Sequence, residues 1–280
     1  MLFDSHAHIN FEDYTEEDRN QLIKEIEASD LAYVMDVGFD LISSIQAVKD
    51  AGALEGCFAA IGFHPYDAVK KMTEEDICRL ETLYIRNKDK VKAIGEIGLD
   101  YHYDDTDREL QKLWFRRQIQ LANKLKLPIV VHSRDADQDT LDILKEEGAF
   151  SKERCGWFPQ RRGANCVMEN DARVLLHCFS GSREMGQQYV KLGATLSVAG
   201  PLTFKNNRKT TEMVSGIPME YLLVETDSPY LTPEPFRGKP NKPYFVEHTA
   251  RRLAVIKGVS YETACSQTME NAKVFFDIIE

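Results

Sequence analysis

Short apolar runs alternate with longer amphipathic segments along the whole chain. Eight runs have the length and composition of strands, and several are almost entirely apolar, as parallel strands buried on both faces are. They lie at 2–6, 31–38, 57–62, 91–98, 127–133, 173–179, 194–200 and 221–227. Apolar positions at helical spacing predict helices between them, at 15–29, 40–52, 73–88, 107–126, 135–147, 182–192 and 205–215, and then at 245–256 and 260–277.

The order of these segments predicts the fold class. Thr73 and Ser182 precede acidic residues at two predicted helix starts, and Gly148 and Gly193 follow two predicted helix ends. Strand–helix alternation repeated about eight times predicts an α/β protein with a single (β/α)₈ barrel of the TIM type and an additional C-terminal helix. A doubly wound open sheet is the alternative, but no GxGxxG follows the first strand.

No fixed repeat or low-complexity linker divides the 280 residues, so we expect one barrel domain over 1–280. The stretch 151–170 breaks the alternation and contains Trp157–Phe158 and Arg161–Arg162. Such a loop from a helix to a strand falls on the N-terminal face of a barrel, opposite the face that carries chemistry. We therefore interpret it as a surface insertion or a subunit contact rather than a clamp for nucleic acid.

Composition narrows the functional classes. A net charge of −10 argues against broad, non-specific binding to nucleic acid, although a local metal site can still accept a phosphate substrate. The six cysteines show no CxxC spacing, and neither a signal peptide nor an apolar run long enough for a membrane span is evident. We expect a cytoplasmic protein with reduced thiols, no membrane association and no obligate protein partner.

The seven histidines have an uneven distribution. All but His248 follow or end predicted strands, where barrel enzymes build their active sites: His6, His8, His64, His102, His132 and His177. In the first strand, strict alternation places His6 and His8 on one face together with Asp4. Histidines that served only in packing would be spread over helices and both faces, so this distribution predicts a metal or catalytic site.

Three carboxylates fall at equivalent heights, namely Glu96, Glu225 and Asp227. Imidazole and carboxylate ligands together suit Zn, Mn, Fe or Ni, whereas Mg prefers more oxygen. Four histidines with two carboxylates exceed the needs of one ion, and Glu96 is central enough in strand order to bridge two. Taken alone, His132 or His177 would also fit a core histidine, and Glu96 would fit half of a buried ion pair. That alternative requires all of these residues to converge by accident.

Six motifs occur in order: DSHAHI, GFHPYDA, AIGEIGLDY, VVHSRDA, LLHCFSGS and ETDSPYL. Together they resemble the TatD family of metal-dependent deoxyribonucleases, within the amidohydrolase-like barrels, over nearly the whole chain with 151–170 as an insertion. The resemblance implies two divalent ions, of Zn, Mn, Mg, Ni or Fe, and leaves room for a third near the scissile phosphate. The first ion would be held by His6, His8, Glu96 and Asp227, and the second by Glu96, His132 and His177.

The resemblance also implies substrate contacts. His64 falls where the family has a histidine near the scissile phosphate, and Arg134, Ser180 and Lys205 fall at phosphate-contact positions, with Asn206 beside the last. A solvated surface charge is nearly as good an interpretation of Lys205. Many relatives read PHRG and NEP where this chain has PFRG at 235–238 and NKP at 241–243. We hypothesise that Phe236 stacks on a base and that Lys242 contacts a phosphate.

The expected activity is that of a divalent-metal-dependent phosphodiesterase, a 3′–5′ exonuclease on single-stranded DNA. Hydroxide activated by two metals would attack the phosphodiester, with Glu96 and Asp227 as catalytic residues and Asp227 taking the proton. Arg134 would stabilise the developing charge. A metal-dependent ester or amide hydrolase, such as a D-aminoacyl-tRNA deacylase, is the alternative, with RNA or aminoacyl-tRNA as substrate. A non-enzymatic nucleic-acid-binding protein is the third hypothesis, which a missing ligand would have favoured.

Overall fold

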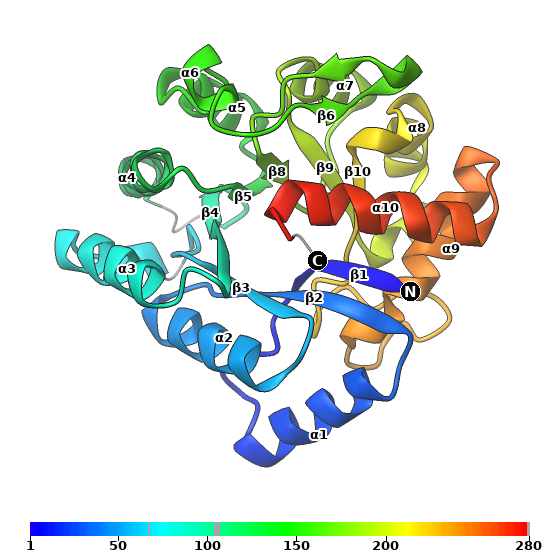
Figure 1. Ribbon diagram of the computed structural model, residues 1–280, viewed down its shortest axis with the longest axis horizontal. Helices are drawn as coiled ribbons and strands as arrows, with labels where there is room; N and C mark the ends of the chain where they lie inside the picture. Colours follow the sequence, from blue (N-terminus) through cyan, green and yellow to red (C-terminus); the bar gives the residue numbers. More distant parts are fainter. Residues whose placement is uncertain (67, 104–106, 279–280) are drawn as a thin grey trace.

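The computed structural model describes residues 1–66, 68–103 and 107–278. Eight parallel strands form one sheet and are hydrogen-bonded in chain order. They are β1 (Leu2–Ala7), β2 (Leu31–Val37), β3 (Cys57–Ile61), β4 (Val91–Asp100), β5 (Ile129–Arg134), β8 (Val174–Leu176), β9 (Thr195–Val198) and β10 (Leu222–Val224). A parallel bridge between Ala7 and Ser228 brings the first strand to the end of the last, so the sheet nearly closes into the predicted barrel (Figure 1).

Helices surround this barrel, and each predicted helix has a counterpart. The longer ones are α1 (Glu16–Glu27), α2 (Leu41–Ala53), α3 (Glu74–Arg86), α4 (Arg108–Leu125), α5 (Asp137–Glu146), α7 (Arg183–Lys191), α8 (Arg208–Gly216), α9 (Val246–Lys257) and α10 (Tyr261–Phe276). Single 3₁₀ turns are η1 (Ala68–Lys70), η3 (Gly200–Thr203), η4 (Met219–Tyr221) and η5 (Pro243–Phe245). Helix α8 begins three residues later than predicted, because the Asn207 side chain caps it by accepting from the Thr210 N–H. Across the described residues, no helix is both long and apolar enough to cross a membrane.

Helix α10 lies across the end of the barrel at which the strands begin (Figure 1). Its Phe275 and Phe276, with Ile278 beyond its end, pack on a layer of apolar side chains inside the barrel. That layer includes Phe3, Met35, Ala60, Ala93, Val130, Leu175 and Leu223. Apolar side chains therefore fill the barrel at its N-terminal end.

The stretch 151–170 forms α6 (Lys152–Cys155), the turn η2 (Ala164–Cys166) and an antiparallel pair, β6 (Arg161–Arg162) with β7 (Met168–Glu169). Its side chains reach the beginnings of barrel strands. Arg154 is fully buried and donates to the carbonyls of Ala172 and Leu127 at 2.8 and 2.7 Å. Arg161 is buried as well and donates to Thr195 Oγ1 at 2.7 Å, so it is not available as a clamp for nucleic acid.

Candidate metal centre

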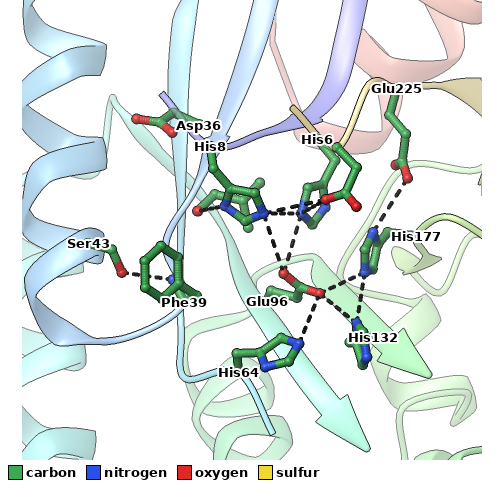
Figure 2. A network of polar contacts seen from close by, with 12 residues as sticks. His6, His8, Asp36, Phe39, Ser43, His64, Glu96, His132, His177 and Glu225 are labelled. Atoms are coloured by element: carbon green, nitrogen blue, oxygen red, sulfur yellow. Dashed lines mark hydrogen bonds and ion pairs between the residues drawn. The ribbon is translucent and has the colours of Figure 1, made fainter. Parts of the chain in front are cut away.

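The structure brings all six expected metal ligands together at the C-terminal end of the barrel. His6 lies in β1, Glu96 in β4 and His132 in β5. His8, His177 and Asp227 lie just after β1, β8 and β10. Figure 2 shows Glu96 between His6 and His8 on one side and the other three labelled histidines, His64, His132 and His177, on the other. The loop-side ends of neighbouring parallel strands thus supply the whole set, as the histidine distribution predicted.

One oxygen of Glu96 faces the first group of ligands. Nε2 of His6 and Nε2 of His8 are 3.3 Å apart. Glu96 Oε2 lies 3.5 Å from the former and 3.8 Å from the latter. Asp227 Oδ1 lies 3.8 and 3.5 Å from the same two nitrogens. Ligands at about 2.0–2.1 Å from a tetrahedral zinc ion are about 3.3 Å apart, so these four groups fit a divalent ion between them.

The other oxygen of Glu96 faces the second group. Glu96 Oε1 lies 2.7 Å from Nε2 of His177 and 2.8 Å from Nδ1 of His132, and these nitrogens are 3.3 Å apart. Three ligand atoms this close could hold an ion. The separation of Glu96 Oε1 from the two nitrogens would then widen modestly, toward the spacing of ligand atoms around a metal ion. Because each carboxylate oxygen serves a different histidine pair, Glu96 is placed to bridge two ions.

A third group of ligand atoms adjoins the second. His64 Nε2 lies 3.7 Å from Glu96 Oε1, and His64, Asp100 and His132 present ligand atoms within 4.8 Å of one another. The expectation of a third ion therefore has a candidate location. His102, in contrast, lies outside these groups, because its exposed imidazole pairs with Asp135 at 3.1 Å.

Outer contacts hold the imidazoles in position. Nδ1 of His8 lies 2.7 Å from the carbonyl of Val37, and Nε2 of His132 lies 3.1 Å from Asp100 Oδ2. Such partners fix the ring orientation and tautomer of metal-binding histidines. Sequence reasoning missed Asp100, although it lies four residues after Glu96 in β4 and side chains on one strand face repeat every two residues.

Asp4 was expected to join His6 and His8 but does not. Its carboxylate accepts hydrogen bonds from the Thr226 N–H and hydroxyl at 2.8 and 2.5 Å. The pairing of β1 with β2 shifts between Asp4 and Ala7, so strict alternation does not hold along this strand. Asp4 instead ties β1 to the segment that carries Asp227, whose N–H donates to the His6 carbonyl at 2.9 Å.

The neighbouring histidines keep the two central carboxylates, Glu96 and Asp227, ionised. Burial alone would raise the pKa of Glu96, but the field of His177 and the hydrogen bond with His132 hold it well below its usual value. The pKa of Asp227 is likewise lowered, against the effect of burial, by the hydrogen bond with His8. Both side chains are therefore ionised at neutral pH, in the form that binds cations. Burial and the neighbouring His132 lower the pKa of His64 to about 3, which keeps that imidazole neutral.

The ligands lie at the floor of a cavity of about 1150 Å³. His64, Arg134 and Ser180, three of the expected substrate contacts, line it. Lys205 and Asn206 are exposed but do not line it, whereas the neighbouring Asn207 does. The structure thus gathers three of the expected contacts around the metal ligands and leaves Lys205 outside.

The two hypotheses from the PFRG and NKP segments are not supported. The ring of Phe236 stacks on Phe245 with centroids 4.5 Å apart, and it does not line the cavity. The ammonium group of Lys242 pairs with the Glu25 carboxylate, which also accepts from the Tyr244 hydroxyl at 3.0 Å. Both side chains are engaged in packing the loop after β10 against the protein.

Comparisons with known proteins show to which family the chain is related. The family model described as TatD related DNase matches residues 3–277. The chain is 42% identical over 278 residues to the metal-dependent hydrolase YabD of Bacillus subtilis, covering 99% of this chain and 100% of that protein. It is 33% identical over 280 residues to the metal-dependent hydrolase YcfH of Escherichia coli K12, covering 99% and 96%. The crystal structure of YjjV, a TatD homologue from Escherichia coli, superposes with a TM-score of 0.85 at 24% identity, covering 99% and 98%.

Proposed function

Because the chain belongs to the TatD family of metal-dependent hydrolases, we propose that it is a phosphodiesterase that removes nucleotides from the 3′ end of single-stranded DNA. The observation that carries the proposal is the position of Glu96, whose two carboxylate oxygens face separate histidine groups (Figure 2). Two divalent ions bound there would act as Lewis acids, neutralising charge on a phosphoryl group and activating water.

The protein's own side chains would transfer the proton, position the ligands and stabilise the developing charge. Asp227, ionised and one-seventh exposed to the cavity, would accept the proton of the attacking water. Glu96 is fixed by contacts with histidines from four strand ends, so it would keep both ligand groups in register. His64 would present a neutral imidazole to the scissile phosphate, and Arg134 would offset the charge that develops on it.

The proposal is tested on protein stripped with a chelator and resupplied separately with Mg, Mn, Zn, Ni or Fe. A 5′-labelled single-stranded oligodeoxynucleotide should give a ladder that shortens from the 3′ end only when metal is present. Glu96→Gln should abolish the ladder, whereas Glu212→Gln, which changes an exposed carboxylate on α8, should not. A circular strand, which has no 3′ end, should remain intact.

Other outcomes would redirect the assignment. Cleavage of the circular strand would show endonucleolytic action. Turnover of D-aminoacyl-tRNA without turnover of DNA by the same metal-loaded protein would favour the ester hydrolase. Tight DNA binding without turnover of either substrate would favour the non-enzymatic hypothesis.

A further inference from the structure

Among the described residues, charge is unevenly distributed around the cavity mouth. The lysine and arginine side chains that line it are Lys70 and Lys71, which follow β3, and Arg134, the last residue of β5. The loops after β1 and β2 contribute Glu12 and Asp40 instead. The β3–β5 side also includes two aspartates. Asp76 pairs with Arg79 at 3.3 Å and belongs to the capping box of α3, and Asp100 Oδ2 lies 3.1 Å from Nε2 of His132.

The wall formed by the loops after β8, β9 and β10 is different. Apart from the ligands His177 and Asp227, its described lining residues carry no acidic or basic side chain. Most of them are apolar, and the polar ones, such as Ser180, Asn207 and Thr210, are uncharged. Its apolar lining includes Phe179, Val198, Leu202 and Leu231. This wall suits an uncharged group with a flat apolar surface, whereas the β3–β5 side suits an anion.

Two tyrosines lie among the basic residues. The rings of Tyr66 and Tyr103 are in contact, with centroids 4.4 Å apart and an interplanar angle of 36°. Tyr103 is 44% exposed, and the guanidinium carbon of Arg134 lies 5.6 Å from its ring centroid. Within the described residues, no carboxylate pairs with Arg134 or Lys71. We call the set Tyr66, Lys71, Tyr103 and Arg134 the cationic rim.

A nucleic-acid strand has the same asymmetry as the cavity. On the 5′ side of the last phosphodiester, every nucleotide carries a phosphate and a base. On the 3′ side, only the terminal nucleoside remains, and it has no further charge. Aromatic side chains beside cations are the usual platform for single strands, because every base has a π face.

We propose that the strand leaves the cavity over the cationic rim, with the base on the 5′ side of the scissile phosphate stacked on Tyr103 and the terminal nucleoside on the uncharged wall. This inference rests on the proposed function and specifies its substrate. Tyr103 is then a specificity-determining residue, and the asymmetry of charge sets the polarity of cleavage.

The stacking contact is tested by removing either partner. Substrates are a 5′-labelled oligothymidylate and the same strand with an abasic analogue at the penultimate position. The proteins are the metal-loaded wild type, Tyr103→Ala, Tyr103→Phe and the control Tyr84→Ala, which changes a ring on α3 outside the cavity. Because stacking changes affinity by about 5- to 150-fold per base, the wild type and Tyr84→Ala should show at least about a 5-fold rise in KM without the base. Tyr103→Ala should show almost none, and Tyr103→Phe should behave as the wild type does.

Equal penalties for base removal in the wild type and in Tyr103→Ala would overturn the inference while leaving the proposed function intact. If no strand is hydrolysed, the proposed function fails, and the same comparison is read from fluorescence anisotropy of labelled strands with the metal-loaded proteins. If removing the base lowers the affinity of the wild type but not that of Tyr103→Ala, the rim is upheld as a binding surface. If the base contributes equally to both proteins, or if neither binds, the rim is refuted.

The placement of the two ends of the strand has its own tests. A 3′-phosphate would place extra negative charge against the uncharged wall, so it should slow cleavage at least about 10-fold, and equal rates would contradict this polarity. Arg134→Ala should reduce the slope of log KM against log salt by about 0.7, the value for one phosphate contact on a single strand. Arg86→Ala, which removes an exposed arginine on α3, should leave that slope unchanged.

Discussion

Oε1 of Glu225 lies 3.4 Å from Nδ1 of His177, across the imidazole ring from the nitrogen that contacts Glu96 (Figure 2). Glu225 is fully buried, and its other oxygen accepts a hydrogen bond from the Ser197 hydroxyl at 2.5 Å. A carboxylate behind a metal-binding histidine sets the tautomer and makes the ring a stronger ligand. The sequence marked Glu225 as part of the carboxylate set, but only the structure places it behind His177.

Replacing Glu225 by glutamine keeps its shape and removes its charge. We expect Glu225→Gln to weaken metal binding about 10- to 100-fold, as loss of an outer partner usually does. Competition with a chromophoric chelator measures this directly and does not depend on activity. Glu212→Gln, an exposed carboxylate on α8, is the matched control. An unchanged metal affinity in Glu225→Gln would show that His177 needs no support from Glu225.

The bridging position of Glu96 predicts how metal content divides among variants. His8→Ala removes a ligand of the first group and should leave the second ion in place, whereas His177→Ala should have the converse effect. Glu96→Gln should weaken both, because its oxygens face both groups. Elemental analysis after dialysis reads the stoichiometry, with His248→Ala on α9 as a variant that should keep the full content. Full occupancy of either site in Glu96→Gln would rule out the shared ligand.

Much of the fold and the metal centre could be predicted from the sequence because both follow simple periodicities. Parallel strands buried on both faces appear as continuous apolar runs, and their C-terminal ends mark one rim of the barrel. His6, His132 and His177 could therefore be placed together before any contact was known. Thr73 and Ser182 marked helix starts for an equally local reason, since Ser182 accepts from the Met185 N–H.

The rest depended on contacts that periodicity does not encode. Tyr66 and Tyr103 meet through the conformations of two separate loops, and Asp4 turns to Thr226 where the strand register shifts. Phe236 is of a residue type that can stack on a base, but one face of its ring packs against Phe245. A single sequence gives no signal for such choices, because they depend on which partner the folded chain brings near.

Arg154 provides a test of how firmly the stretch 151–170 is attached to the barrel. Its guanidinium is fully buried and donates to three backbone carbonyls at or just before strand beginnings and to Asn123 Oδ1. We expect Arg154→Met to lower the free energy of unfolding by about 2–5 kcal/mol, because buried acceptors lose their donors. The midpoint of urea unfolding measures the change. Arg162→Met, at an exposed neighbour on β6, should shift that midpoint little, and equal shifts would contradict the argument.

We expect the contribution of Lys257 to the free energy of unfolding to rise at alkaline pH. Its ammonium group, at the end of α9, donates to the Ile217 carbonyl, and burial lowers its pKa to about 8 from an unfolded value of about 10.4. Between these values the unfolded chain binds more protons at this site, so its contribution to the free energy of unfolding increases with pH. Urea unfolding at pH 7.5, 8.5 and 9.5 should show the wild type gaining stability relative to Lys257→Met across this window. Lys152→Met, at an exposed lysine, should follow the wild type throughout. A constant difference between wild type and Lys257→Met would mean that this ammonium group is as well solvated in the folded protein as in the unfolded chain.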